Sequence, residues 1–265
     1  MLAGKRAFIT GSFQGIGLGV AKVLASEGCA IVLHGLADPA QIAAAVNVVT
    51  AVGAPKVEAH TSDLRDPAAT EALIATILAS GPVDILVNNA GIQFTAPLAQ
   101  MPREKWNDII AINLSSAFDT MRLLLPQMAE RGYGRVINVA SVHGLVASVD
   151  KAPYVSAKHG IVGLTKVAAL EYASQGDAAK GGVTINAICP GWVETPLIEP
   201  QIQARADKYN GDRQAGIADL LSEKQPSRRL AATTDIGALA SWLCDPRAHN
   251  ITGAAIPIDG GWSAQ

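Results

Sequence analysis

A tyrosine and a lysine stand four residues apart in the stretch A-P-Y-V-S-A-K-H-G, as Tyr154 and Lys158. Four residues make about one turn of an α-helix, so the two side chains would share one helix face. On an exposed helix such a pair has no special role. In a pocket, the ammonium would favour the phenolate, and the tyrosine could exchange a proton near neutral pH. The pair is therefore a candidate acid–base group that depends on its surroundings.

A second chemical signal is the glycine run G-S-F-Q-G-I-G, which contains Gly11, Gly15 and Gly17. Glycine lets the backbone approach a pyrophosphate closely, and a helix N-terminus offers free N–H groups and a partial positive charge. A plain tight turn between a strand and a helix is the alternative. Because the run follows an apolar strand at the start of the chain, it favours a dinucleotide site.

The end of the expected second strand bears on which dinucleotide is bound. An arginine near this point accepts the 2′-phosphate of NADP, whereas a carboxylate holds the ribose of NAD. The stretch V-L-H-G-L-A-D has neither Arg nor Lys, His34 is a weak substitute, and Asp38 is more simply a helix cap. We therefore expect NAD. Asp63, after the third strand, either hydrogen-bonds the adenine amino group or is an ordinary loop aspartate.

Strands and helices alternate along the chain and must position these groups. The apolar strands predict a single-domain, Rossmann-type, doubly wound parallel sheet of the α/β class over residues 1–265. The polar segment 191–228 breaks the alternation, and we expect it to be an inserted helical substrate lid. One long helix is expected at 102–128. The expected strands lie at 6–10, 29–34, 56–60, 83–91, 134–141, 182–191 and 254–259.

Composition excludes several classes of function. The net charge is −2 without any basic or acidic block, so a nucleic-acid or anionic-membrane partner has no electrostatic support. The N-terminal stretch does not resemble a signal peptide, and we expect no membrane span. The cysteines Cys29, Cys189 and Cys244 are an odd set without metal spacing. They indicate reduced thiols, no metal site and a cytoplasmic protein.

Further motifs complete an ordered set: N-N-A-G at 88–91, Asn113, Ser141 and P-G at 190–191. With the glycine run and Y-V-S-A-K, this set resembles the short-chain dehydrogenase/reductase family along essentially the whole chain. The resemblance implies hydride transfer between an alcohol and a nicotinamide. A free tyrosine has a pKa of ~10, and lowering it by ~3 units requires ~4 kcal/mol of preference for the phenolate. An adjacent ammonium and the positive nicotinamide ring could supply this preference.

The resemblance also assigns roles to individual residues. Tyr154 would be the general base or acid, Ser141 would hydrogen-bond the reacting oxygen, and Lys158 would also bind the nicotinamide ribose. Asn113 would support a water-mediated proton relay. Members of the family usually form tetramers, so we expect a homotetramer; the apolar stripe at 121–128 would be either interface or core. The expected cofactor contacts are Gly11, Phe13, Gly15, Ile16, Gly17, Leu36, Asp63, Leu64, Asn89, Ala90, Gly91, Tyr154, Lys158, Pro190, Gly191 and Val193.

Within that family, the chain resembles the D-3-hydroxybutyrate dehydrogenases at 91–93, 140–148, Lys151, 189–197, 222–227 and 259–262. This implies NAD-dependent oxidation of D-3-hydroxybutyrate to acetoacetate. A small substrate with a carboxylate needs a cation and polar donors near the tyrosine, and Lys151 would give the charge. Ordinarily Lys151 would be a solvated loop charge and His143 a satisfied loop histidine. The expected substrate contacts are Gln93, Ser141, His143, Lys151, Tyr154, Trp192, Gln201 and Trp262.

Two other functions stay open on sequence alone. One is a related short-chain reductase that acts on another small hydroxy acid, a sugar or a ketone. A reductase of acyl carrier thioesters would normally show basic residues that select NADP, and these are missing. The other is a noncatalytic nucleotide sensor, against which the intact set of Ser141, Tyr154 and Lys158 argues.

Overall fold

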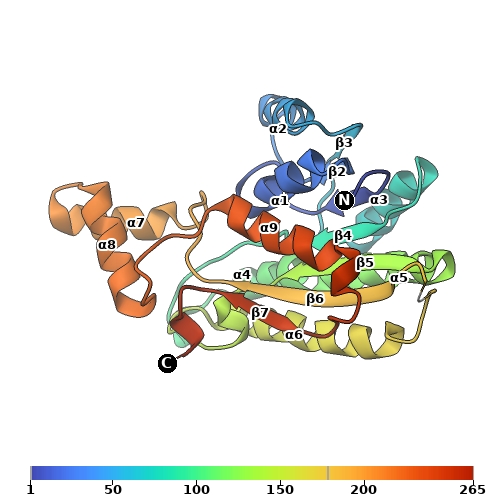
Figure 1. The fold of residues 1–265 in the computed structure, drawn as a ribbon. Coiled ribbons are helices and arrows are strands. Elements are labelled where there is room, and N and C mark those ends of the chain that lie inside the picture. Colours follow the sequence, from blue (N-terminus) through green and yellow to red (C-terminus); the bar gives the residue numbers. More distant parts are fainter. Residues whose placement is uncertain (1, 178, 265) are drawn as a thin grey trace.

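The computed structural model describes residues 2–177 and 179–264, in which a parallel seven-stranded sheet lies between two layers of helices (Figure 1). The strand order is β3-β2-β1-β4-β5-β6-β7. The order reverses between β1 and β4, and ligands of such sheets bind at this switch point. The strands are β1 (Arg6–Ile9), β2 (Ala30–His34), β3 (Val57–His60), β4 (Ile85–Asn88), β5 (Tyr133–Val139), β6 (Gly182–Pro190) and β7 (Ala255–Ile258).

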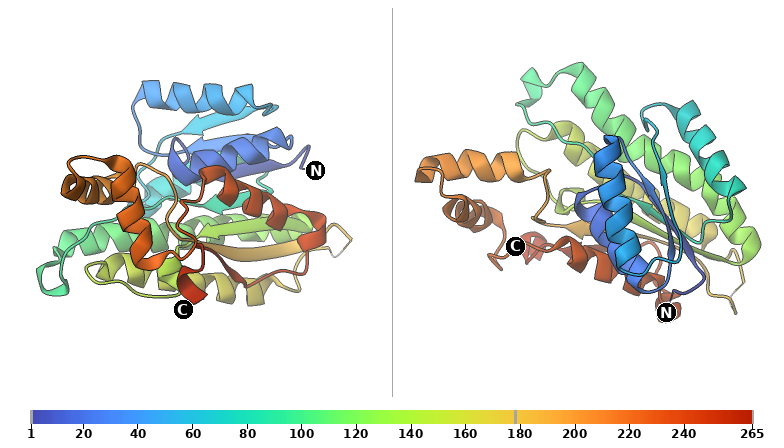
Figure 2. Two further views of the ribbon diagram at one scale, coloured as in Figure 1. Left: turned by 60° about the vertical axis from the view of Figure 1, so that its left-hand side comes forward. Right: turned by 90° about the horizontal axis from the view of Figure 1, so that it is seen from above.

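Helices cover both faces of the sheet, which explains why β1, β4 and β5 are buried along their whole length. One face packs against α1 and α9, which lie side by side (Figure 2). The other face packs against α3, α5 and α6. These helices and their neighbours are α1 (Gly15–Ser26), α2 (Pro39–Ala51), α3 (Pro67–Ala79), α4 (Arg103–Ile110), α5 (Ser116–Arg131), α6 (Ala152–Tyr172) and α9 (Thr233–Cys244).

The predicted strands and helix starts are confirmed, with small shifts at their ends. Asp38 caps α2 by accepting a hydrogen bond from the backbone N–H of Gln41 at 2.9 Å. Asp66 caps α3 in the same way through Ala68. Short polar side chains before a proline therefore set both helix starts. The sheet class and the order of the elements follow the sequence prediction.

The helix predicted at 102–128 is interrupted. A π-helical turn, η2 (Ala111–Ser115), separates α4 from α5 and carries Asn113. The whole stretch Arg103–Arg131 is long and apolar enough to cross a membrane by length and composition alone, a test that the core helix of a globular protein also passes. Half of its most apolar portion is buried within the fold, where it packs against α3 and α6. The apolar stripe at 121–128 is core, because Met121, Leu124, Leu125 and Met128 are buried.

The segment 191–228 forms two short helices joined by a 3-10 turn: α7 (Glu199–Ala206), η4 (Asp207–Tyr209) and α8 (Arg213–Lys224). The two helices pack on each other and stand apart from the sheet (Figure 1). Their apolar contacts form a small cluster of their own around Ile198, Ile202 and Leu220. The prediction that this segment is partly helical is confirmed.

Candidate active site

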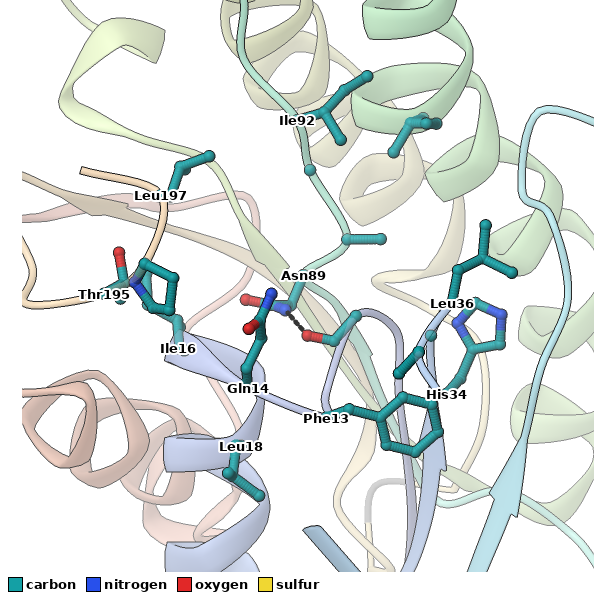
Figure 3. Close-up of a pocket in the computed structure, with 18 of the residues that line it drawn as sticks. Phe13, Gln14, Ile16, Leu18, His34, Leu36, Asn89, Ile92, Thr195 and Leu197 are labelled. Atoms are coloured by element: carbon teal, nitrogen blue, oxygen red, sulfur yellow. Dashed lines mark hydrogen bonds between the residues drawn. The ribbon is translucent and has the colours of Figure 1, made fainter. Parts of the chain in front are cut away.

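The glycine turn is fastened to the N-N-A-G turn across the switch point of the sheet. The side-chain amide of Asn89 donates to the carbonyls of Thr10 (2.9 Å) and Gly11 (2.8 Å). Figure 3 shows Asn89 hydrogen-bonded to the glycine turn. Gly11 has a φ of +62°, and a Cβ there would lie 2.8 Å from the Cα of Ala90. A Cβ on Gly17 would lie 2.5 Å from the Asn89 amide nitrogen. Glycine is therefore required at both positions, and the start of α1 faces the cleft.

A cleft of about 700 Å³ runs along this turn (Figure 3). Its volume lies within the range of cofactor and ligand sites. Gly17 lies behind the turn and does not line the cleft, while Pro190, Gly191 and Val193 line a neighbouring pocket instead. Of the predicted cofactor contacts, those that line the cleft are Gly11, Phe13, Gly15, Ile16, Leu36, Asp63, Leu64, Asn89, Ala90, Gly91, Tyr154 and Lys158.

One end of the cleft is apolar and uncharged. The ring of Phe13 lies against Gly35, where a Cβ would come within 2.9 Å of it. Leu36 is exposed at the mouth. Burial lowers the pKa of His34 to about 4, so this histidine is neutral. Among the described residues that line the cleft, Lys158 is the only lysine or arginine, and it lies with Tyr154 on α6.

Asp63 lines the same cleft with a fixed carboxylate. Arg65 donates to both of its oxygens, at 2.6 to 3.0 Å, and these hydrogen bonds lower the pKa of Asp63. The carboxylate is thus an ionised acceptor at neutral pH. A contact with an adenine amino group stays a prediction.

The structure brings the predicted catalytic groups together. Ser141 follows β5, and Tyr154 and Lys158 are buried on one face of α6. Burial raises the pKa of Tyr154, and a hydrogen bond with Ser141 opposes this effect. Burial also lowers the pKa of Lys158 to about 8. The expected lowering of the tyrosine pKa depends on the positive nicotinamide ring as well as on Lys158, and it stays a prediction.

Asn113 connects the π-helical turn to the loop after β4. Its side-chain amide donates to the carbonyl of Ile92, and its oxygen accepts from the N–H of Ile92, both at 2.9 Å. The neighbouring residues Ile92 and Ile112 line the cleft. Single-turn π-bulges inside helices are frequent at functional sites. Asn113 thus fixes the wall of the cleft opposite the glycine turn, and its part in a proton relay stays a prediction.

A second, smaller pocket of about 60 Å³ adjoins the cleft at Tyr154. A single water needs about 10–15 Å³, so this pocket admits a ligand of only a few non-hydrogen atoms. It also contains the three residues at 190, 191 and 193 that we had expected at the cofactor. The predicted substrate contacts that line it are Gln93, Ser141, His143, Lys151, Tyr154, Trp192 and Trp262.

The pocket holds one buried cation beside aromatic rings. Lys151 is 9% exposed, so the alternative of a solvated loop charge is wrong. Burial, together with the charges of Lys224 and Arg205, lowers the pKa of Lys151 to about 8. Its ammonium lies 5.2 Å from the ring centroid of Trp192, which is tilted against Trp262 at 5.5 Å. A desolvated ammonium of this kind gains strongly from an anionic partner.

His143 is buried and neutral, because burial and the charges of Lys151 and Lys224 lower its pKa to about 3. Nδ1 lies 3.4 Å from the Ser141 hydroxyl, and Nε2 lies 2.9 Å from the Ser148 hydroxyl. Both ring nitrogens thus have hydrogen-bond partners within the protein. This agrees with the alternative that His143 is a loop histidine whose hydrogen bonds are all made within the protein. A direct contact of His143 with substrate stays a prediction.

Gln201 is linked to the pocket by a hydrogen bond with Gln93, which lines it. With its amide oriented so that the oxygen accepts, Gln201 receives a hydrogen bond of 2.6 Å from Gln93 Nε2. Its nitrogen then donates to the carbonyls of Leu197 and Ile198 at the start of α7. Gln201 does not itself line the pocket. It joins the segment 191–228 to a residue that does.

Sequence reasoning missed Ser148 and Lys224. Lys224 Nζ donates to Ser148 Oγ at 2.8 Å and lies 5.6 Å from the ring centroid of Trp262. Lys224 lies in the stretch 222–227 that carries part of the family resemblance, but nothing in its neighbouring sequence distinguishes it from a surface lysine at a helix end. Its position depends on how α8 packs over the pocket. Across residues 2–177 and 179–264, no group of three or more His, Cys, Asp or Glu side chains is placed to hold a metal ion.

Known proteins resemble this chain over its whole length. Residues 5–206 match the family described as short chain dehydrogenase. The D-beta-hydroxybutyrate dehydrogenase of Cupriavidus necator is 48% identical, covering 100% of both chains. The enzyme of the same name from Rhizobium meliloti is 43% identical, covering 98% of this chain and 99% of its own.

A solved structure gives the same fold. The L-sorbose reductase of Gluconobacter frateurii, complexed with NADPH and L-sorbose, has a TM-score of 0.91 at 28% identity, covering 100% of this chain and 98% of its own. Together with the glycine turn and the cleft, this relationship indicates a nicotinamide cofactor. The match over residues 5–206 and the full-length relatives show that the chain belongs to the short-chain dehydrogenase family.

Proposed function

We propose that this protein oxidises D-3-hydroxybutyrate to acetoacetate with NAD, in a reversible hydride transfer. The observation that carries the proposal is the pocket of about 60 Å³, which combines one buried cation, Lys151, with Tyr154 and Ser141. A steroid or a long acyl chain would not fit this volume, and a neutral alcohol would leave the ammonium without a counter-charge. The two relatives named D-beta-hydroxybutyrate dehydrogenase support the same substrate.

The proton and the hydride leave the alcohol in different directions. Tyr154, as phenolate, takes the hydroxyl proton, and Ser141 donates a hydrogen bond to the same oxygen. When bound in the cleft, the nicotinamide ring supplies the acceptor for the hydride that leaves the carbinol carbon. Lys158 stabilises the phenolate by its charge. The reverse reaction returns the proton from Tyr154 to the carbonyl oxygen.

The substrate carboxylate would lie at Lys151. The amide of Gln93 is a further donor, held in place by Gln201. The indole N–H of Trp192 is buried and has no hydrogen-bond partner among the described residues, so it too is a donor suited to an anion. Trp192 and Trp262 would enclose the methyl group and exclude water. These contacts would hold the carbinol carbon between Tyr154 and the cleft.

The uncharged end of the cleft supports NAD rather than NADP as the cofactor. A 2′-phosphate carries about two negative charges and needs basic partners. His34 is neutral, Leu36 is apolar, and the ring of Phe13 fills the space over Gly35. Asp63 lines the same cleft, and its carboxylate is paired with Arg65. A ribose hydroxyl would be tolerated at the uncharged end, whereas a 2′-phosphate would lack a basic partner among the described residues that line this end of the cleft.

The segment 191–228 would act as a lid over the single domain. Its helices have a separate apolar cluster and reach the pocket through Gln201 and Lys224. NAD and acetoacetate together cannot react, so they would hold the closed form. We expect them to slow proteolytic cleavage within 191–228. An equal cleavage rate with and without them would disprove closure.

Assembly and location complete the proposal. Apolar side chains are exposed on the neighbouring helices α5 (Phe118) and α6 (Val167, Leu170), as expected for a homotetramer that buries these helices. Sedimentation velocity would give the mass of the assembly. The three cysteines are buried and unpaired, which suits a reducing compartment such as the cytoplasm.

The direct test uses both isomers of 3-hydroxybutyrate with NAD or NADP, and follows the absorbance of the reduced nicotinamide. Turnover with the D isomer and NAD alone is expected. Turnover only with other hydroxy acids, sugars or ketones would keep the reaction and reject the substrate. Cofactor binding without turnover on any alcohol would favour a nucleotide sensor.

A further inference from the structure

A continuous chain of hydrogen bonds joins the lid to the catalytic serine. Lys224, the last residue of α8, donates to the hydroxyl of Ser148 at 2.8 Å. Ser148 Oγ lies 2.9 Å from Nε2 of His143, and Nδ1 of His143 lies 3.4 Å from Oγ of Ser141. The backbone N–H of His143 also donates to Ser141 Oγ at 3.2 Å. Two side chains, those of Ser148 and His143, thus connect a lysine of the lid to Ser141, the group that would face the reacting oxygen.

The two ends of this chain have different hydrogen-bonding capacities. An ammonium can only donate, a hydroxyl has one hydrogen to give, and a neutral imidazole carries one N–H and one lone pair. His143 is neutral at physiological pH. The chain therefore has two arrangements, which differ in the ring nitrogen of His143 that carries the proton.

The charge of Lys224 favours one arrangement. In that arrangement Ser148 accepts from Lys224 and donates to Nε2, so the imidazole turns its lone pair toward the cation. The proton is then on Nδ1, which donates to Ser141. In the opposite arrangement the Nε2–H dipole points at the cation, and the hydrogen of Ser148 loses this acceptor. The opposite arrangement is therefore less stable, because its N–H dipole is repelled by the cation and because it has one hydrogen bond fewer.

The tautomer of His143 determines the direction of the hydrogen bonds at Ser141. Its oxygen receives the hydrogen bonds from the backbone N–H and from Nδ1 of His143, so its own hydrogen points to the reacting oxygen or to Tyr154. In the opposite tautomer, Ser141 would donate to Nδ1 and present a lone pair to the substrate. A lone pair opposite an alkoxide or carbonyl oxygen would oppose hydride transfer.

We propose that Lys224 is a positioning residue which, through Ser148, holds His143 in its Nδ1–H tautomer and so makes Ser141 a hydrogen-bond donor to the substrate. The inference deepens the proposed function and relies on it only for the identity of the substrate. It also couples lid position to chemistry, because Lys224 is the last residue of α8 and a movement of α8 would change its hydrogen bond with Ser148.

The test compares Lys224→Met, which removes the charge at similar length, with Lys224→Arg, which keeps a cationic donor. Lys208→Met is the matched control, because Lys208 also lies in the lid but pairs with Asp219 at its surface. We expect kcat to fall about 10-fold in Lys224→Met and to recover largely in Lys224→Arg, below the 10²–10³-fold loss typical of deleting an oxyanion donor. Lys208→Met should behave as wild type.

The second readout needs no substrate. Nitrogen-15 shifts of labelled histidine identify the protonated ring nitrogen, and the signal of His143 among the five histidines is the one lost in His143→Gln. We expect Nδ1–H in the wild type and a shift toward Nε2–H in Lys224→Met. Ser148→Ala should give the same change, and the double variant should add little to it.

The outcomes separate this inference from its alternatives. If Lys224 only fastens the lid, Lys224→Met will raise KM while the tautomer and kcat stay unchanged, and the proposal is overturned. A wild-type His143 with its proton on Nε2 overturns it as well. If 3-hydroxybutyrate is not oxidised at all, the proposed function fails, but the nitrogen shifts still decide the tautomer.

Discussion

The ammonium of Lys158 lies 5.6 Å from the ring centroid of Tyr154 and donates a 2.7 Å hydrogen bond to the carbonyl of Val139. The lysine thus acts on the tyrosine through its field, without donating to the phenol in any hydrogen bond of this structure. Burial of the phenolate opposes this effect, since the pKa of Tyr154 is raised in the protein alone.

Replacing Tyr154 by phenylalanine removes the base and leaves the cleft intact. We expect kcat to fall by about 10³-fold or more, because general acid–base catalysis contributes roughly 10²–10⁴-fold. NAD affinity, measured by calorimetry, should stay close to that of the wild type. Tyr172→Phe, at the other end of α6, is the control. A substantial residual rate in Tyr154→Phe would refute the role of the base.

Ionisation of Tyr154 should depend on the cofactor. Because burial raises the pKa of Tyr154, the protein alone should show no tyrosinate from this residue at pH values where exposed phenols begin to ionise. The positive charge of bound NAD should bring that pKa down. The measurement is the tyrosinate absorbance of the wild type minus that of Tyr154→Phe, with and without NAD. Identical difference spectra in the two states would contradict this expectation.

Lys151 should distinguish acidic from neutral substrates. Lys151→Met removes the counter-charge for the carboxylate, and we expect kcat/KM for D-3-hydroxybutyrate to fall about 100-fold, since pairing a desolvated charge is worth a few kcal/mol. A neutral secondary alcohol such as 2-butanol should lose far less. Both rates are read from reduced nicotinamide. Equal losses would show that Lys151 does not hold the carboxylate.

The same residue predicts a pH dependence. The pKa of Lys151 is lowered to about 8, so its cation is present below this pH and is lost as the pH rises through it. KM for D-3-hydroxybutyrate should therefore increase above about pH 8, while KM for 2-butanol stays level. In Lys151→Arg the guanidinium remains charged, and the increase should disappear. A wild-type KM that is constant across this range would rule out Lys151 as the titrating group.

Cofactor choice should respond to a basic residue at the mouth of the cleft. Leu36 is exposed there, and Leu36→Arg would offer a guanidinium to a 2′-phosphate. We expect kcat/KM with NADP to rise about 10- to 100-fold, in line with a new charge-assisted hydrogen bond, and kcat/KM with NAD to change little. Leu36→Met serves as the neutral control. If NADP is used equally well before and after the change, the uncharged end of the cleft does not select NAD.

Local sequence was sufficient for the class of fold and for the shared helix face of the candidate catalytic pair. Alternating strands and helices predicted the parallel sheet, because buried strands must be apolar on both faces. Asp38 and Asp66 predicted helix starts through chemistry confined to a single turn. The spacing of Tyr154 and Lys158 predicted their shared face, since helical periodicity is a local property.

Contacts between distant segments were decided by the tertiary structure alone. The sequence suggested a continuous helix at 102–128, whereas a π-helical turn lets Asn113 bind the backbone of Ile92. It predicted Gly191 and Val193 as cofactor contacts, and packing places both in the smaller pocket that adjoins the cleft, where the contact stays a prediction. It gave no sign that Lys224 meets Ser148, which lies 76 positions earlier in the chain. Sequence periodicity reports which face of an element is buried, but only packing decides which elements meet, and therefore which charge is joined to Ser141 through Ser148 and His143.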